Sequence, residues 1–183
     1  IYNRRALKFM SNRKVLLAAV PLFLVLIIDS MGLGLLFPIL NSLIVDPHNH
    51  FLASTVGSGM RAFLFSGTIA IFMLCWFFGA AILGDLSDGI GRKKALVICL
   101  LGAFGGYFLS AIAVVVKSMT LLIVGRVIAG FTAGSQSIAQ AAIVDVSSEE
   151  HKARNISYMI LAISVGFVLG PIFGGFLSDS HLV

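Results

Sequence analysis

Two charged residues, Asp29 and Arg126, lie inside long apolar stretches of this sequence. A charge near the middle of a bilayer opposes insertion by at least about 2.5–3.5 kcal/mol. Such residues are retained where they face a polar interior, so a site for a proton or a substrate is the chemistry that they indicate. The alternative is a structural ion pair that sets the register of two helices.

Three more polar side chains follow Arg126 in the same apolar stretch. At about 100° per residue, Ser137 and Gln140 project within roughly 40° of Arg126 on a helix, and Gln136 lies about 80° away. We interpret Gln136, Ser137 and Gln140 as the lining of a candidate substrate cavity. Hydrogen bonds between packed helices are the alternative explanation.

Five apolar stretches must position these residues, because a helix needs roughly 20 residues to cross the hydrocarbon core of a bilayer. The expected spans are residues 15–40, 62–84, 95–116, 120–144 and 155–178. Lipid cannot satisfy unpaired backbone groups, so each span is expected to be helical.

The composition agrees with a membrane protein. Of the 183 residues, 58% are hydrophobic and 11% are charged, whereas a soluble domain has about 25% charged residues. This excludes a water-soluble domain and an intrinsically disordered chain. Cys75 and Cys99 both lie in apolar stretches, which excludes a disulfide framework and a cysteine-based zinc site. The fold class is therefore all-α integral membrane, with about five transmembrane helices.

Positive charge indicates the orientation. Ten of the thirteen lysines and arginines lie before the first span or in the connections 2–3 and 4–5, whereas Arg61 and Lys117 lie on the other side. The positive-inside rule places the ten in the cytoplasm. We therefore expect a cytoplasmic basic N-terminus over residues 1–14 and a transmembrane bundle over residues 15–183.

Two segments are rich in glycine. The connection between the second and third spans contains Gly84, Asp88, Gly91 and Arg92; Asp88 and Arg92 are four residues apart and can form a local ion pair. The fifth span contains a row of small residues and a proline: Gly166, Gly170, Pro171, Gly174 and Gly175. Glycines spaced by four let a neighbouring helix approach closely, and the proline kinks its helix.

Four motifs together resemble the major facilitator superfamily. Residues 84–94 are similar to its signature between the second and third spans, and residues 122–130 to its fourth-helix motif. Residues 166–175 match its fifth-helix antiporter motif, and residues 29–38 resemble drug/proton antiporters of the tetracycline-resistance type. The chain is identified as the N-terminal helical bundle of such a transporter.

The resemblance implies roles for particular residues. Gly84, Asp88, Gly91 and Arg92 would form a conformational latch, and Arg126 would serve proton coupling. From its place inside the membrane we expect Asp29 to serve proton or substrate coupling as well. The fifth-helix residues named above would be the antiporter motif. Relatives have two similar halves with alternating access around a central site, so we expect a missing C-terminal half as a partner, beside the lipid bilayer and a small-molecule substrate, and no nucleic acid.

The function that we expect is proton-coupled export of a small organic or drug-like molecule. Proton-driven uptake of a small metabolite such as a siderophore, or a truncated fragment that does not transport, are the alternatives. We expect no enzyme, because catalytic groups are missing, no metal, and no cofactor, with the proton as coupling ion. The expected location is a bacterial inner (plasma) membrane, with the N-terminus in the cytoplasm.

Overall fold

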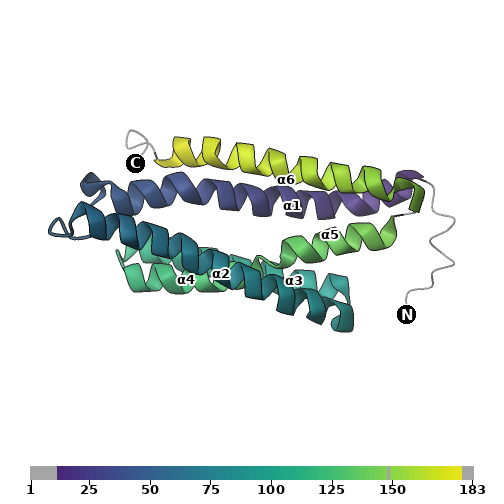
Figure 1. Ribbon diagram of the computed structural model, residues 1–183, viewed down its shortest axis with the longest axis horizontal. Coiled ribbons are helices and arrows are strands. Elements are labelled where there is room, and N and C mark those ends of the chain that lie inside the picture. The colour runs from purple at the N-terminus through teal and green to yellow at the C-terminus, as the bar shows by residue number, and fades with distance from the viewer. Residues whose placement is uncertain (1–11, 148, 179–183) are drawn as a thin grey trace.

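The computed structural model describes residues 12–147 and 149–178, and every regular element in these residues is helical (Figure 1). The elements are α1 (Asn12–Leu40), the π-helical turn η2 (Asn41–Val45), the 3-10 turn η3 (Pro47–Asn49), α2 (Ser58–Ile90), α3 (Arg92–Val115), α4 (Met119–Thr132), α5 (Ser135–Val146) and α6 (Glu149–Ser178). Most of the basic segment expected at residues 1–14 lies outside the described residues.

In the described part of the chain, five helical segments are long and apolar enough to cross a membrane, which confirms the expected number. The fourth span, Met119–Asp145, is made of two helices, α4 and α5, that meet at a break over Ala133 and Gly134. Gly91 separates the second span from the third. Its φ of +95° is a conformation that glycine adopts readily, so α2 ends and α3 begins there.

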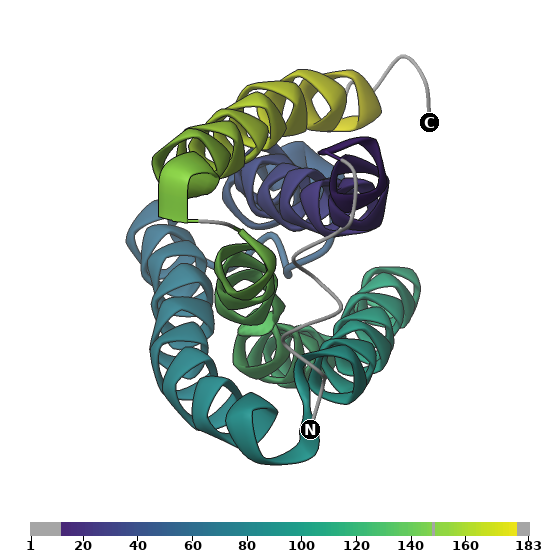
Figure 2. The same ribbon diagram turned by 90° about the vertical axis from the view of Figure 1, so that its right-hand side faces the viewer.

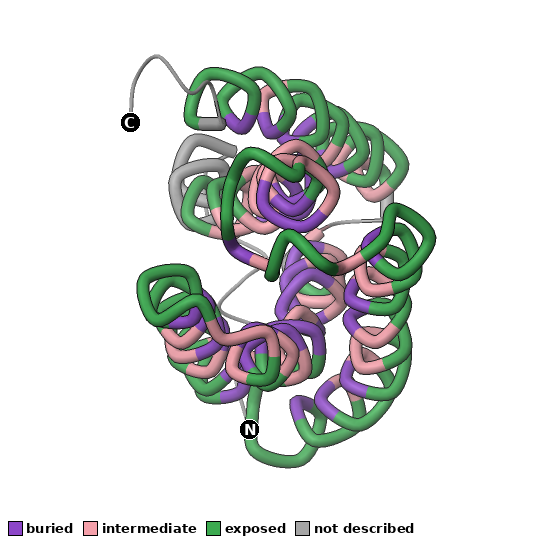
Figure 3. Tube along the Cα trace, turned by 90° about the vertical axis from the view of Figure 1, so that its left-hand side faces the viewer, coloured by how far each residue is buried: buried purple, intermediate pink, exposed green. Residues whose placement is uncertain are grey.

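The broken fourth span lies at the centre of the bundle. In the end-on view, α5 lies in the middle, with α1 and α6 above it, α2 to its left and α3 to its lower right (Figure 2). In the most apolar 18-residue stretch of the fourth span, 50% of the residues are buried, whereas the corresponding share in the other four spans is 17–28%. Arg126, Ser135 and Gln136 of this span are buried, while the outer faces of the bundle are exposed (Figure 3). Large apolar side chains such as Val115 and Phe63 lie on the exposed faces, as expected of surfaces that contact lipid.

Three glycines of the fifth span bring α6 against α1. Gly166, Gly170 and Gly174 are buried, and a methyl group on Gly170 would lie 2.5 Å from the carbonyl oxygen of Met31. A methyl group on Gly166 would lie 2.5 Å from the carbonyl oxygen of Ile27. The row of glycines is therefore the contact that lets the two backbones approach closely, and it holds the segment of α1 that carries Asp29.

The other two residues of the antiporter motif lie differently. Gly175 is exposed, and a methyl group there would meet no atom within 4 Å. Pro171 is exposed overall, but its Cδ would lie 2.7 Å from a methyl group on Gly34. Pro171 therefore packs against a glycine of α1, whereas Gly175 is outside the helix contact.

Arg61 organises the segment between α1 and α2. Its side chain is 3% exposed and donates hydrogen bonds to the carbonyl oxygens of Ile44, Ala53 and Val56, each at 3.1 Å. It also donates to the carbonyl oxygen of Asp46 at 3.5 Å, so one guanidinium group satisfies four backbone acceptors between α1 and α2. The sequence indicated only that this charge lies on the side opposite the basic connections.

Candidate functional site

Asp29 lies inside the bundle, on the side of α1 that faces α5. Its Oδ2 accepts a hydrogen bond from the hydroxyl of Ser135, the first residue of α5. The carboxyl group lines a small cavity of about 10 Å³, whose wall includes Trp76 of α2, Tyr107 of α3 and Gln136 of α5. Ala129 of α4 lines it as well, so Asp29 touches a space to which five helices contribute.

A second hydrogen bond joins the same two helices at the next residue of each. The amide Nε2 of Gln136 donates to Ser30 Oγ at 3.2 Å. Ser30 and Ser135 are fully buried, and Gln136 is 8% exposed. Two consecutive residues of α1 thus bind two consecutive residues of α5, close to the break in the fourth span.

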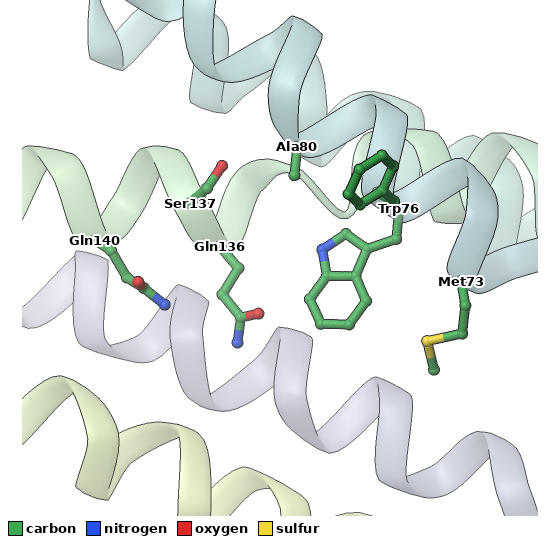
Figure 4. Close-up of a pocket in the computed structure, with 7 residues that line it drawn as sticks. Met73, Trp76, Ala80, Gln136, Ser137 and Gln140 are labelled. Carbon is green, nitrogen blue, oxygen red and sulfur yellow. The ribbon is translucent and has the colours of Figure 1, made fainter.

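An open pocket of about 490 Å³ lies beside this pair (Figure 4). Its walls come from α2 and α5 and consist of Met73, Trp76, Phe77, Ala80, Gln136, Ser137 and Gln140. The structure therefore brings together the three polar residues that the sequence singled out, and adds an aromatic and apolar wall. Trp76 and Gln136 line both this pocket and the small cavity of Asp29. An apolar pocket with a few polar groups is the usual form of a small-molecule site.

Arg126 does not lie on this pocket. It is 5% exposed, and its Nη2 and Nε donate to the hydroxyl of Ser110 in α3 at 2.8 and 3.3 Å. Its guanidinium carbon lies 5.3 Å from the ring centre of Tyr107, a cation–π contact. The angles calculated from the sequence assumed one unbroken helix, and the break between α4 and α5 separates Arg126 from the pocket.

Asp29 and Arg126 form no ion pair with each other in the part of the chain that the structure describes. The alternative of a structural pair between them is therefore absent from this conformation. Tyr107 lies between the two groups, because its side chain lines the cavity of Asp29 and stacks on Arg126.

The expected latch residues meet at the junction of α2 and α3. Arg92 Nη2 lies 2.7 Å from Asp88 Oδ1, and its Nη1 donates to Ser87 Oγ at 2.6 Å. Its Nε also lies 3.1 Å from Oδ2 of Asp145, near the end of α5. One guanidinium group therefore ties the second and third spans to the fourth. Gly84 contributes its carbonyl oxygen, which accepts from Ser87 Oγ at 2.7 Å.

Removal of the link between Arg92 and Asp145 is expected to have a small effect on stability. Their side chains are 30% and 57% exposed, so solvent screens the pair, and we expect a coupling energy of about 0.2–1 kcal/mol. A double-mutant cycle of Arg92→Gln and Asp145→Asn, followed by thermal unfolding in detergent, measures it. Additive effects of the two substitutions would contradict the contact; Asp85→Asn, an exposed carboxyl on α2, is the control.

Several residues of the site were missed from the sequence: Ser30, Trp76, Tyr107, Ser110, Ser135 and Asp145. A usable signal existed for two of them, since Ser30 directly follows Asp29 and Ser135 directly precedes Gln136.

The described residues contain no group of three or more side chains suited to hold a metal ion.

Comparisons with known proteins cover most of the chain. A family model described as the Major Facilitator Superfamily matches residues 22–182. The tetracycline resistance protein, class C, of Escherichia coli is 35% identical over 156 residues, covering 85% of this chain and 36% of that protein. The class H protein of Pasteurella multocida is 32% identical over 158 residues, covering 86% of this chain and 37% of that protein. The chain thus spans less than two fifths of the length of these relatives.

A solved structure has the same fold. The crystal structure of the human organic anion transporter MFSD10 (TETRAN) superimposes with a TM-score of 0.71 at 24% sequence identity. The match covers 91% of this chain and 42% of that one. The expected helical bundle is confirmed by this likeness.

Proposed function

Because this chain belongs to the major facilitator superfamily, we propose that it forms part of a proton-coupled transporter that exports a small organic molecule. The observation that carries the proposal is the shared wall of two spaces. Trp76 and Gln136 line both the small cavity of Asp29 and the open pocket. A group that can exchange a proton therefore lies next to a space that can hold a small molecule.

The roles follow from this geometry. Gln136, Ser137 and Gln140 offer amide and hydroxyl groups to the molecule in the pocket, while Trp76 and Phe77 offer aromatic surface. Asp29 takes up and releases the coupling proton. Arg126 lies behind Tyr107, whose ring contacts its guanidinium group and also lines the cavity of Asp29.

The packing of the helices supports alternating access. In such a cycle, groups of helices rock around a central site. The contact of α6 with α1 needs the small residues Gly166, Gly170 and Gly174, which match the antiporter motif and favour export over uptake. Arg92 closes one end of the bundle by joining Ser87, Asp88 and Asp145, the contact that a latch must break and remake.

A second half would complete the central cavity. The pocket is open rather than enclosed, and the curated relatives are much longer than this chain. We propose that a second bundle, present in those relatives, covers the pocket, and that the exposed apolar faces of this chain contact lipid.

Inside-out membrane vesicles test the proposal. Tetracycline is the first probe, because relatives of the chain are named for resistance to it. With the vesicle interior acidified, export predicts that tetracycline accumulates inside, and that a proton-conducting uncoupler abolishes the accumulation. Accumulation only with the gradient reversed would show uptake and contradict export. If no member of a panel of small organic molecules accumulated in either direction, the transport proposal would fail.

A further inference from the structure

Two hydrogen bonds connect the site of Asp29 to the pocket through the start of α5. Ser135 donates to Asp29, and Gln136 donates to Ser30 at 3.2 Å. Ser135 does not line the pocket itself, whereas Gln136, Ser137 and Gln140 on the next turns of α5 do. The side chain of Asp29 itself is thus joined to α5 by one buried hydroxyl group, that of Ser135.

The start of α5 is a place where the backbone can adjust. The fourth span is interrupted at Ala133 and Gly134, so the first turn of α5 is only partly tied to α4. The backbone N–H of Gln136 donates to the carbonyl oxygen of Ala133 at 3.3 Å, a bond over three residues rather than four. A break inside a membrane span is a common hinge position. Gly134 contacts α2, since a methyl group there would lie 2.9 Å from the carbonyl oxygen of Gly79.

We propose that Ser135 is a positioning residue that transmits the protonation of Asp29 to the pocket by moving the first turns of α5 about the break at Ala133–Gly134. The inference rests on the proposed function, in which Asp29 takes up and releases the coupling proton.

The physical cause is the change in one hydrogen bond. A hydroxyl that donates to a charged carboxylate forms a bond roughly twice as strong as one to a neutral acceptor. When Asp29 is charged, Ser135 holds the start of α5 against α1. When Asp29 binds a proton, the carboxyl group loses its charge and this restraint weakens, while Ser135 keeps its own proton. The same coupling acts in reverse, so a molecule bound to Gln136 alters proton binding at Asp29.

Few other groups near Asp29 can titrate or carry charge. From α3, Tyr107 lines the same cavity and Cys99 lies within electrostatic range. From α4, Arg126 stacks behind Tyr107. The residues that α2 and α5 place near Asp29 do not titrate; they are Phe72, Trp76, Ser135 and Gln136. From α6, the backbone around Gly166 packs against this part of α1.

Cysteine labelling measures the movement without knowledge of the substrate. Gln140→Cys places a thiol on the α5 wall of the pocket, and Ala80→Cys places one on the α2 wall. Both are made in a Cys75→Ser background, because Cys75 is half-buried, whereas Cys99 is buried. The ratio of the two maleimide labelling rates cancels most of the effect of pH on thiol reactivity. The ratio is measured over a pH range in which the Asp29 carboxyl group changes from protonated to charged. We expect it to change by about fivefold or more, which is the lower end of typical coupling between sites.

Variants of the full-length protein test the role of the Ser135 hydroxyl group. Ser135→Ala and Asp29→Asn should each make the ratio independent of pH, and Ser135→Thr, which keeps a hydroxyl, should restore the change. Ser164→Ala should keep it, because Ser164 is exposed on α6 and binds only the carbonyl oxygen of Ile160 in its own helix. If Ser135→Ala does not fold, the pair Ser135→Thr and Ser135→Val carries the same comparison at nearly equal volume.

Two results would overturn the inference: a ratio that does not change with pH in the parent protein, or a full change in Ser135→Ala or Ser135→Val. Either result leaves transport untouched if tetracycline or another probe still accumulates in vesicles. Absence of proton-driven accumulation of any probe, with a pH-dependent ratio, would instead contradict the proposed function while the link between Asp29 and the pocket stands.

Discussion

Asp29→Asn is expected to reduce proton-driven accumulation of the transported molecule by roughly 100-fold or more, the scale at which a positioned proton-transfer group acts. The amide oxygen of asparagine can still accept the hydrogen bond from Ser135, but it is uncharged, so the substitution resembles the protonated carboxyl group. What is lost is the ability to bind and release a proton, because an amide does not titrate near neutral pH.

The measurement separates binding from coupling. Equilibrium binding of the accumulated probe to purified Asp29→Asn protein should persist, whereas accumulation driven by an imposed proton gradient should disappear. Asp85→Asn is the matched control, since it removes an exposed carboxyl group from α2 by the same chemical change. Unchanged proton-coupled flux in Asp29→Asn would show that the coupling proton binds elsewhere.

Gly170→Ala is expected to destabilise the bundle, whereas Gly175→Ala, five residues further along α6, is not. The added methyl group on Gly170 would lie 2.5 Å from the carbonyl oxygen of Met31 and 2.7 Å from Cα of Gly34. Both neighbours are backbone atoms and cannot rotate away, so α1 and α6 must separate. Overpacking of this kind lowers the free energy of unfolding by about 1–3 kcal/mol or more.

The control has the opposite expected sign. A methyl group on Gly175 meets nothing within 4 Å, and replacing glycine by alanine in a helix favours the helix by up to about 1 kcal/mol. The apparent Tm of each variant in the same detergent gives the comparison. If both variants showed the same Tm as the parent protein, the glycine row would not be a close contact. Loss of transport in Gly170→Ala beyond its loss of folded protein would link this contact to the cycle.

Much of the fold was predictable because its signals are local. Length and continuous apolarity are enough to predict five spans, since the thickness of the bilayer dictates how many residues must be apolar. The glycine spacing in residues 166–174 predicted a close helix contact for a similarly local reason, because residues four apart share a helix face. The pair of Asp88 and Arg92, also four apart, forms as predicted.

The tertiary structure alone decided the partners of the buried polar groups. Asp29 binds Ser135, which is 106 residues away, and Arg126 binds Ser110 rather than Asp29. Periodicity assigns a residue to a face of its own helix but does not say which helix lies opposite. In lipid the hydrophobic effect does not favour one pairing of helices over another. Which helices pack together therefore depends on small residues and a few hydrogen bonds.

The break at Ala133–Gly134 is the other feature that the sequence did not reveal. A constant angle per residue holds only within an unbroken helix, and the break resets the faces of α5 relative to α4. It directs Gln136, Ser137 and Gln140 to the pocket and leaves Arg126 against α3. The sequence by itself determined the class of protein, its spans and its intramembrane charges, because these follow from local composition. The packing of α1, α2, α3 and α5 around the break decided which of those charges lies beside the pocket, because that depends on contacts between distant segments.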